Sequence, residues 1–394
     1  MTFGARVRRR AAFATALALL LAPVATASGG PSEGGFSSDN VEWIRHVPTA
    51  IGTAEGGRVF GNYFYVTTNQ QGLLIFDLDK PADPKLVGRL VLPHQFENED
   101  VSTNGEILLL SQFGDASYSG ERAPVSSLHV VDVEDKTNPH VIATVPGAGD
   151  HTYDCILDCR WAYSPTGHVV DLRDPARPRL MEDKWVEMTE LGNGIPPAHD
   201  VTEVAPGMVL VASEPMVYLD ARKDPVHPKV LAMSDGSRNS FHNVIWPRGA
   251  KDKLIMSASE AIKPRCTRPT AMFKTWDASR WKKTKTFTPL DEYLPENGTF
   301  TDGNPTVSAT WYGCSAHWFE PHESFNNGGL VAAAFYSHGV RFLDIASDGK
   351  IKEVGYFTPH GGATSAAYWV TDEIVYSVDL NRGIDILRFS PESR

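Results

Sequence analysis

The chain has few cysteines, no excess of basic residues and no long apolar run, and each shortage excludes a class of protein. Its four cysteines in 394 residues contain no C-x-x-C pair, so a cysteine-based zinc site is not expected. Lys and Arg number 37 against 48 Asp and Glu, and this net charge of −11 argues against a nucleic-acid partner. No segment reaches the roughly 20 apolar residues that a membrane-spanning helix needs.

Common catalytic motifs and long helical patterns are missing as well. The sequence has no G-x-S-x-G, no H-E-x-x-H and no P-loop. Its apolar residues instead form short β-type runs separated by Gly, Pro, Asn or Asp, with 33 Gly and 27 Pro in total. The pattern predicts an all-β fold.

The N-terminus has the pattern of a signal peptide over residues 1–27. A charged stretch ends at Arg10, Ala11 to Ala22 is a short apolar run, and Ala25-Thr26-Ala27 matches a cleavage site. We therefore expect a secreted, periplasmic or cell-surface protein. Residues 28–39 are rich in Gly and Ser, which predicts a flexible leader before the folded domain of 40–394.

Four cysteines in an exported chain predict two disulfide bonds, for which three connectivities exist. Cys155 and Cys159 are four residues apart and suit a tight hairpin, which leaves Cys266 to pair with Cys314. Free thiols and the crossed pairing are the alternatives.

One pattern recurs along the chain: an apolar run, an Asp, a short loop with Pro and a second apolar run. It reads GLLIFDLDKPADPKLVG from Gly72 and MVYLDARKDPVHPKVL from Met216. Six steps from Asp77 to Arg388 give a mean period of about 52 residues. The equivalent positions are Asp77, Asp132, Asp171, Asp220, Asp277, Asp344 and Arg388.

About four β-type runs per period, seven times over, predict a seven-bladed β-propeller. We expect the repeated Asp to accept backbone N–H bonds in the following turn. The last period has three strands only, so residues 41–47 are expected to supply its outer strand and close the ring. A segment of about 261–314 is interpreted as an insertion in the fifth blade that forms a lid or specificity loop, or else a decorated outer strand.

The repeats LLIFDLDKPADP, LHVVDVEDKTNP and HVVDLRDPARP resemble those of the LVIVD-repeat family of exported β-propellers. The resemblance covers about residues 40–394 and implies a seven-bladed propeller at or beyond the cell surface. It implies little about activity. A more distant similarity of fold links the chain to selenium-binding and methanethiol-oxidase-type propellers.

Histidines recur at the residue that leads into the first strand of four consecutive repeats: His151, His199, His242 and His317. First strands converge on the axis of a propeller, so these imidazoles are expected to face one another at one mouth of the channel. Glu99 holds the equivalent position in an earlier repeat. Further polar residues expected at this mouth are His94, His360, Asp200, Glu214, Glu260 and His338.

Two interpretations of this cluster remain open. Neutral imidazoles on rigid strands suit a transition metal, here Cu, Zn or Fe, with the four histidines as ligands. In that case Glu99 and His338 are the candidate catalytic residues of a metal-dependent oxidase that acts on a small polar molecule. Alternatively, the histidines were copied with the repeat and stabilise each strand, and the chain is a non-catalytic, monomeric propeller that binds an envelope protein.

Overall fold

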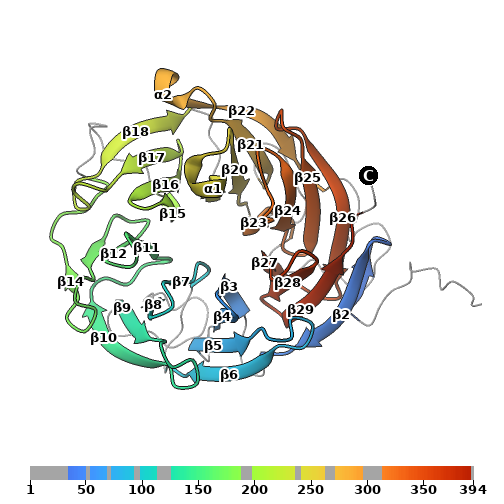
Figure 1. Cartoon of the computed structure of the whole chain (residues 1–394), viewed down its shortest axis with the longest axis horizontal. Helices are drawn as coiled ribbons and strands as arrows, with labels where there is room; N and C mark the ends of the chain where they lie inside the picture. The colour runs from blue at the N-terminus through green and yellow to red at the C-terminus, as the bar shows by residue number, and fades with distance from the viewer. Residues whose placement is uncertain are drawn as a thin grey trace, which may run out of the picture.

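Strands make up nearly all of the regular structure, and they are arranged as sheets around a central axis (Figure 1). This computed structural model describes residues 34–49, 54–68, 72–92, 98–112, 126–187, 198–235, 241–261, 271–295 and 313–391. Each sheet runs outward from the axis, and the chain passes from one sheet to the next around the ring. The predicted all-β propeller is therefore confirmed.

Three sheets of four antiparallel strands come from the first part of the chain. The first contains β3 (Ala54–Phe60), β4 (Tyr63–Thr68), β5 (Gly72–Asp77) and β6 (Lys85–Leu90). The second contains β7 (Ser102–Thr103), β8 (Ile107–Gln112), β9 (Ser127–Asp132) and β10 (His140–Pro146). The third contains β11 (Asp154–Ile156), β12 (Trp161–Tyr163), β13 (Val169–Asp171) and β14 (Arg179–Leu180).

The next sheet has eight strands and consists of two antiparallel units. One unit contains β15 (Ala198–Ala205), β16 (Met208–Ser213), β17 (Val217–Asp220) and β18 (Lys229–Ser234). The other contains β19 (Phe241–Ile245), β20 (Leu254–Ser259), β21 (Phe273–Asp277) and β22 (Thr286–Tyr293), with the short helices α1 (Pro247–Ala250) and α2 (Trp281–Thr284) in its connections. Parallel pairing of β18 with β22 joins the two units at their outer edges.

The last two sheets each include a strand from the N-terminal end of the described chain. β23 (Phe319–Pro321), β24 (Gly329–Ala334), β25 (Val340–Ile345) and β26 (Ile351–Pro359) are joined by β1 (Gly35–Ser37). β27 (Thr364–Trp369), β28 (Ile374–Asp379) and β29 (Gly383–Phe389) are joined by β2 (Val41–Val47). The predicted closure of the ring by residues 41–47 is thus confirmed.

Two predictions about the boundaries need correction. Part of the expected flexible leader forms β1, because a Cβ at Gly35 would lie 2.2 Å from the carbonyl oxygen of Thr358, and glycine permits this close pairing with β26. Part of the segment predicted as an insertion is regular: β21 and β22 are the third and fourth strands of their unit. The remainder, 262–270 and 296–312, lies outside the described residues.

The repeated Asp has the structural role that the sequence predicts. At five of its positions the carboxylate accepts the backbone N–H of the residue two places further on, at 2.7 to 3.1 Å. These positions are Asp77, Asp132, Asp171, Asp220 and Asp277. Each bond fixes the turn that follows a third strand, so the fourth strand starts in register.

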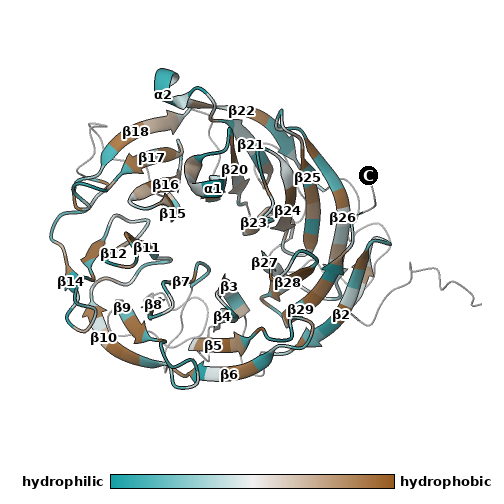
Figure 2. Ribbon diagram, in the orientation of Figure 1, coloured by the Kyte–Doolittle hydropathy of each residue, from teal (hydrophilic) through white to brown (hydrophobic). Residues whose placement is uncertain are grey.

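The core lies between neighbouring sheets. All six residues of the second strands β8 and β16 are buried, whereas the outer strands β6, β10 and β14 are largely exposed. Figure 2 shows the same distribution, with apolar residues on the strands and polar residues at the connecting turns. The inner strands of each sheet are therefore covered on both faces by the neighbouring sheets.

One predicted disulfide is present between Cys155 and Cys159, at the end of β11. Cys314 is also disulfide-bonded, and its predicted partner Cys266 lies outside the described residues. Among the described residues no helix is long and apolar enough to cross a membrane.

A buried carboxylate ties the closing strand to the last sheet. Asp385 on β29 is fully buried; it accepts a hydrogen bond from Trp43 Nε1 at 2.9 Å and lies 3.2 Å from Nδ1 of His46, both on β2. Arg382 adds an ion pair at 3.1 Å. Burial raises the pKa of Asp385, but the hydrogen bonds from His46 and Arg382 outweigh it, and the pKa lies below its ordinary value.

We predict that Asp385→Ala lowers the free energy of unfolding by about 3 kcal/mol near pH 7, because it removes one partner of a buried charged network. Urea denaturation measures this loss. Since the folded pKa lies below the unfolded value of about 3.9, the contribution is complete above that value and disappears as pH falls through the folded pKa. The exposed pair of Glu42 with Arg388 on the same two strands provides the control, and Glu42→Ala should cost less than about 1 kcal/mol. Equal losses for both variants would contradict the assignment.

Candidate metal centre

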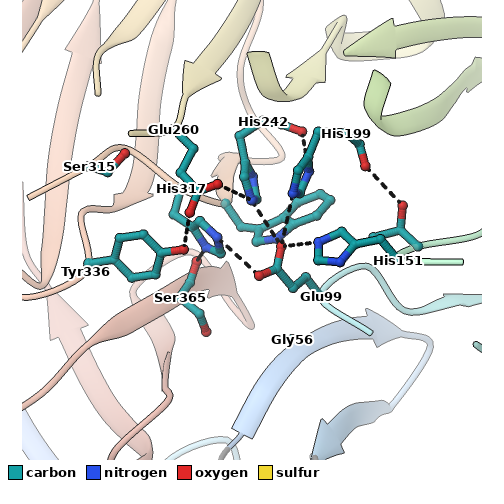
Figure 3. A network of polar contacts seen from close by, with 12 residues as sticks. Gly56, Glu99, His151, His199, His242, Glu260, Ser315, His317, Tyr336 and Ser365 are labelled. Atoms are coloured by element: carbon teal, nitrogen blue, oxygen red, sulfur yellow. Dashed lines mark hydrogen bonds and ion pairs between the residues drawn. The ribbon is translucent and has the colours of Figure 1, made fainter. Parts of the chain in front are cut away.

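Five side chains meet near the axis of the ring, around the carboxylate of Glu99 (Figure 3). Its Oε2 lies 3.0 Å from Nε2 of His242, 3.3 Å from Nε2 of His151 and 3.9 Å from Nε2 of His199. Its Oε1 lies 3.4 Å from Nε2 of His317. The four histidines expected to converge do so, and Glu99 stands in the middle of them.

Irregularities in the first strands place two of these histidines. The register of β15 shifts between Ala198 and Asp200, and that of β19 shifts between Phe241 and Asn243. His199 and His242 are therefore the extra residues of two equivalent β-bulges. A bulge redirects a side chain and increases the local twist. The two rings consequently lie close together, with centroids 3.7 Å apart.

The other members lie in the segments that lead into first strands, and backbone contacts hold them there. The side chain of Asn98 accepts a hydrogen bond from the Ser111 backbone at 2.7 Å, which fixes the residue before Glu99. The strand β3 also approaches closely: a Cβ at Gly56 would lie 1.8 Å from the carbonyl oxygen of Glu99. His317 donates its backbone N–H to Ala334 at 2.9 Å.

Backbone carbonyl groups determine which nitrogen of two rings carries the hydrogen. Nδ1 of His199 lies 3.1 Å from the carbonyl oxygen of His242, and Nδ1 of His317 lies 2.5 Å from that of Ser365. Each Nδ1 must donate, because a carbonyl oxygen can only accept. In the neutral imidazole the Nε2 that faces Glu99 is then a lone pair, which is the arrangement of metal-binding histidines.

Burial and charge set the protonation of the group. Burial raises the pKa of Glu99, but the attraction of His317, His242 and His151 outweighs it and holds this pKa well below its ordinary value. Burial lowers the pKa of His199 strongly, and the neighbouring His242 and His151 lower it further. Burial and His317 lower the pKa of His242 as well. For His317, burial lowers the pKa, but Glu99 raises it above its ordinary value.

His242 is the most constrained member. It is 1% exposed, and neither ring nitrogen makes a hydrogen bond of acceptable geometry to another described residue, although Nε2 lies 3.0 Å from Glu99. A buried polar group without a hydrogen bond is costly. The ring therefore has a nitrogen lone pair that the described protein groups leave unused.

Glu260 extends the cluster on the side of His317. It follows β20, and its Oε2 lies 3.9 Å from Nε2 of His242. The hydroxyl of Tyr336 donates to its Oε1 at 2.6 Å. Two sets of three residues have ligand atoms within 4.8 Å of one another, and they share His242. They are Glu99, His199 and His242, and His242, Glu260 and His317.

These spacings suit a transition-metal ion. Ligand atoms at 2.0–2.2 Å from one ion and at ordinary angles are about 2.8–3.4 Å apart. Glu99 lies 3.0, 3.4 and 3.9 Å from His242, His317 and His199, and the ligand atoms of each set of three lie within 4.8 Å of one another, so the wider pairs exceed this range. Imidazole nitrogens with one or two carboxylates favour Zn, Cu or Fe over Ca or Mg.

Access to the cluster is uneven. The side chains of His242 and His317 are fully buried, and that of Glu99 is 9% exposed. Those of His151 and His199 are 22% and 26% exposed. Solvent and small molecules therefore reach the group from the side of His151 and His199.

Asp200 and Glu214, both predicted at this mouth, are not among the residues described above around Glu99. Asp200 is buried and accepts from Thr202 at 3.1 Å; its burial, with Asp100 and Asp154 nearby, raises its pKa well above the ordinary value. Glu214 precedes a cis peptide bond to Pro215.

The two other histidines predicted here have different surroundings. Burial, followed by Arg341, lowers the pKa of His338 to about 3, and its catalytic role stays a prediction. The ring of His360 packs edge-on against Phe36 of β1, with centroids 4.9 Å apart. His94 lies outside the described residues.

Two residues beside the centre, Trp318 and Tyr336, were not predicted from the sequence. The indole of Trp318 donates to Oε2 of Glu99 at 3.3 Å. Tyr336 orients Glu260, its ring lies 4.4 Å from that of His317, and its φ of 42° is in the left-handed region that a tyrosine rarely adopts. Trp318 follows a predicted ligand directly, which is the one signal that could have found it.

A comparison with known protein families supports the repeat found in the sequence. The model of the LVIVD repeat matches residues 51–91, which include β3, β4, β5 and β6. No curated protein matches the chain.

Solved structures show the same fold. The β-propeller domain of Cps50 (Swd1) from Myceliophteria thermophila is similar with a TM-score of 0.62 and 11% identity, over 89% of this chain and 100% of that domain. A protein of unknown function from Desulfotomaculum acetoxidans is similar with a TM-score of 0.53 and 11% identity, over 79% of this chain and 89% of that one. At this identity the similarity concerns the fold alone. The matched repeat and the propeller fold together support an LVIVD-repeat β-propeller.

Proposed function

We propose that this propeller binds one transition-metal ion, Zn, Cu or Fe, at the centre formed by Glu99, His199, His242 and His317, with Glu260 as a further ligand beside His242 and His317. The observation that carries the proposal is the orientation of the rings of His199 and His317. Both commit Nδ1 to a backbone carbonyl, so both direct Nε2 toward the Glu99 carboxylate.

Without a cation this arrangement is unfavourable. The lone pair of a neutral Nε2 and a carboxylate oxygen repel each other, and low-dielectric surroundings strengthen the repulsion. A metal ion between them converts both groups to ligands. The metal ion also binds the unused nitrogen lone pair of His242.

Protons are the alternative source of positive charge. His317 as an imidazolium would pair with Glu99 and make the cluster a structural ion pair, in line with the raised pKa of His317. That arrangement leaves His199 neutral with its lone pair toward the carboxylate, because burial holds the pKa of His199 far below its ordinary value. Metal analysis separates the two possibilities.

An ion bound here would supply Lewis acidity toward a small polar molecule that enters beside His151 and His199. The chain's own residues would hold the ion, exclude bulk water on the buried side of His242 and His317, and fix Glu260 through Tyr336. The oxidase activity expected from the sequence stays a prediction. The alternative of a non-catalytic propeller that binds an envelope protein also stays a prediction.

We further propose that the ring has seven blades and that the chain is exported. Within the described residues the hydrogen bonds define six sheets, of which the eight-stranded one consists of two four-stranded antiparallel units. Counting β15–β18 and β19–β22 as separate blades supports seven. The N-terminal pattern of 1–27 and the Cys155–Cys159 disulfide support export, because such bonds persist mainly in oxidising compartments.

We predict that the purified protein carries about one metal ion per chain, or takes up one when Zn²⁺ or Cu²⁺ is titrated into chelator-treated protein. His242→Ala should abolish this binding, because His242 belongs to both ligand sets. Elemental analysis and calorimetric titration measure it. His140→Ala, at an exposed histidine of β10, is the matched control and should bind like the wild type. Circular dichroism confirms that each variant is folded. A folded wild-type chain that neither contains nor binds a metal would refute the proposal.

Tyr336→Phe should weaken metal binding about 10- to 100-fold, the usual effect of removing a group that orients a ligand. The variant loses only the hydroxyl that donates to Glu260. Tyr65→Phe is the control, because the Tyr65 hydroxyl is buried and has no hydrogen-bond partner in the described chain. Competition with a metal chelator measures both dissociation constants, and urea denaturation shows whether stability changes in parallel. Equal metal affinities for the two variants would exclude this role of Tyr336.

A further inference from the structure

A second site lies between the β15–β18 and β19–β22 units, away from the metal centre. A cavity of about 780 Å³ is bounded by the connection from β15 to β16, the connection from β19 to β20, and the connection from β21 to β22. Its lining includes residues of α1 and α2 (Figure 1). His242 lies near the start of β19 and Trp246 just beyond its end, about 13 Å further along an extended chain. The cavity therefore opens at the opposite end of the strands from the histidines.

Aromatic rings form the base of this cavity. Tyr218, Trp246 and Trp281 contact one another, with centroids 5.0 to 5.9 Å apart in the three pairs. Trp246 and Tyr218 are buried, and Phe287 supports Trp246 from within the core at 5.4 Å. Trp281 is partly exposed. Trp281 is therefore the ring of this group that a flat ligand can contact, and the buried Tyr218 and Trp246 hold it in place.

Basic residues surround the aromatic base in a chain whose net charge is −11. The described lining contains six of them: Arg222, Lys251, Lys253, Arg280, Lys282 and Lys283. Arg222 already pairs with Asp220 at 2.6 Å. Among the described residues that line the cavity, Asp252 is the only acidic one. It forms an ion pair with Arg248 at 3.6 Å. The remaining cations are not neutralised within the described lining.

Cation–π contacts with the partly exposed Trp281 account for only some of these basic residues. Lys282 and Lys285 each lie 5.8 Å from the ring of Trp281, as cation–π contacts. The side chains of Lys251, Lys253, Arg280 and Lys283 have neither an acidic nor an aromatic partner among the described residues. Like charges gathered at one rim repel each other, so a bound anion would stabilise them.

We propose that this cavity binds a small anionic ring compound, with a phosphate or similar group against the basic rim and its ring against the aromatic base. The volume lies within the range of small-molecule sites, and the combination of an aromatic surface with a few charged groups is typical of them. The site is independent of the metal centre, because the two share no residue.

Calorimetric titration of the full chain tests the proposal, with AMP, adenosine and inorganic phosphate as probes. A chelator is present throughout, so that the phosphate cannot bind through a metal. AMP should bind at least tenfold more tightly than adenosine or phosphate, and added salt should weaken it. Lys282→Glu with Lys283→Glu should lower the affinity at least tenfold, and Trp281→Ala should lower it as well.

The control replaces two lysines elsewhere, Lys80→Glu with Lys85→Glu in the region that joins β5 to β6, and should leave AMP binding unchanged. Metal binding by each variant shows that the fold is intact. Three results would overturn the proposal: no AMP binding, AMP binding no tighter than that of phosphate, or equal losses in the control. Binding of an acidic peptide such as polyglutamate with no binding of AMP would likewise overturn it, and would identify a protein-docking surface instead.

Discussion

The metal centre depends on the burial of a single carboxylate among imidazole nitrogens. Glu99 remains ionised there because three histidines attract its charge more strongly than burial opposes it. That charge in turn needs positive partners. His199 and His317 each commit Nδ1 to a backbone carbonyl, so in their neutral form Nε2 presents a lone pair to the carboxylate. A metal ion between these groups, as proposed, would satisfy the carbonyls, the carboxylate and the rings together, whereas an imidazolium at His317 would leave the lone pair of His199 directed at the carboxylate.

The propeller architecture is what brings the groups to one point. Each first strand runs along the axis, so one residue per sheet faces the same small volume, and the ring fixes their separations. Two equivalent bulges turn His199 and His242 inward by the same backbone irregularity. Rigid strands position His199 and His242, and backbone contacts hold Glu99 and His317 in the segments that lead into their strands. The strained backbone of Tyr336 lies beside this frame, where the surrounding structure can maintain an unfavourable φ.

The sequence predicted the all-β propeller and the four histidines around Glu99, because both follow from periodicity. A repeat of about 52 residues makes equivalent positions comparable, and four histidines then coincide. Asp200 could not be placed from periodicity alone. It follows His199 directly, but a bulge that no sequence pattern reveals gives the two side chains different surroundings. The Asp200 carboxylate accepts a hydrogen bond from Thr202. The position of His360 at the mouth stays a prediction, and its ring packs against Phe36 of β1, a strand within the segment predicted to be flexible. Tyr336 acts through a three-dimensional contact that has no period, and only its position after His317 marks Trp318 in the sequence.

The opposite ends of β19 carry opposite chemistry, and their separation has a physical reason. The end at His242 gathers carboxylates and neutral imidazoles, which attract cations. The end at Trp246 gathers Lys and Arg, which would repel a metal ion if they stood beside it. About 13 Å of strand lies between them, which exceeds the screening length of roughly 8 Å at physiological ionic strength. A chain with a net charge of −11 can therefore hold the proposed anion site and the proposed cation site on the same pair of sheets, because they face away from each other.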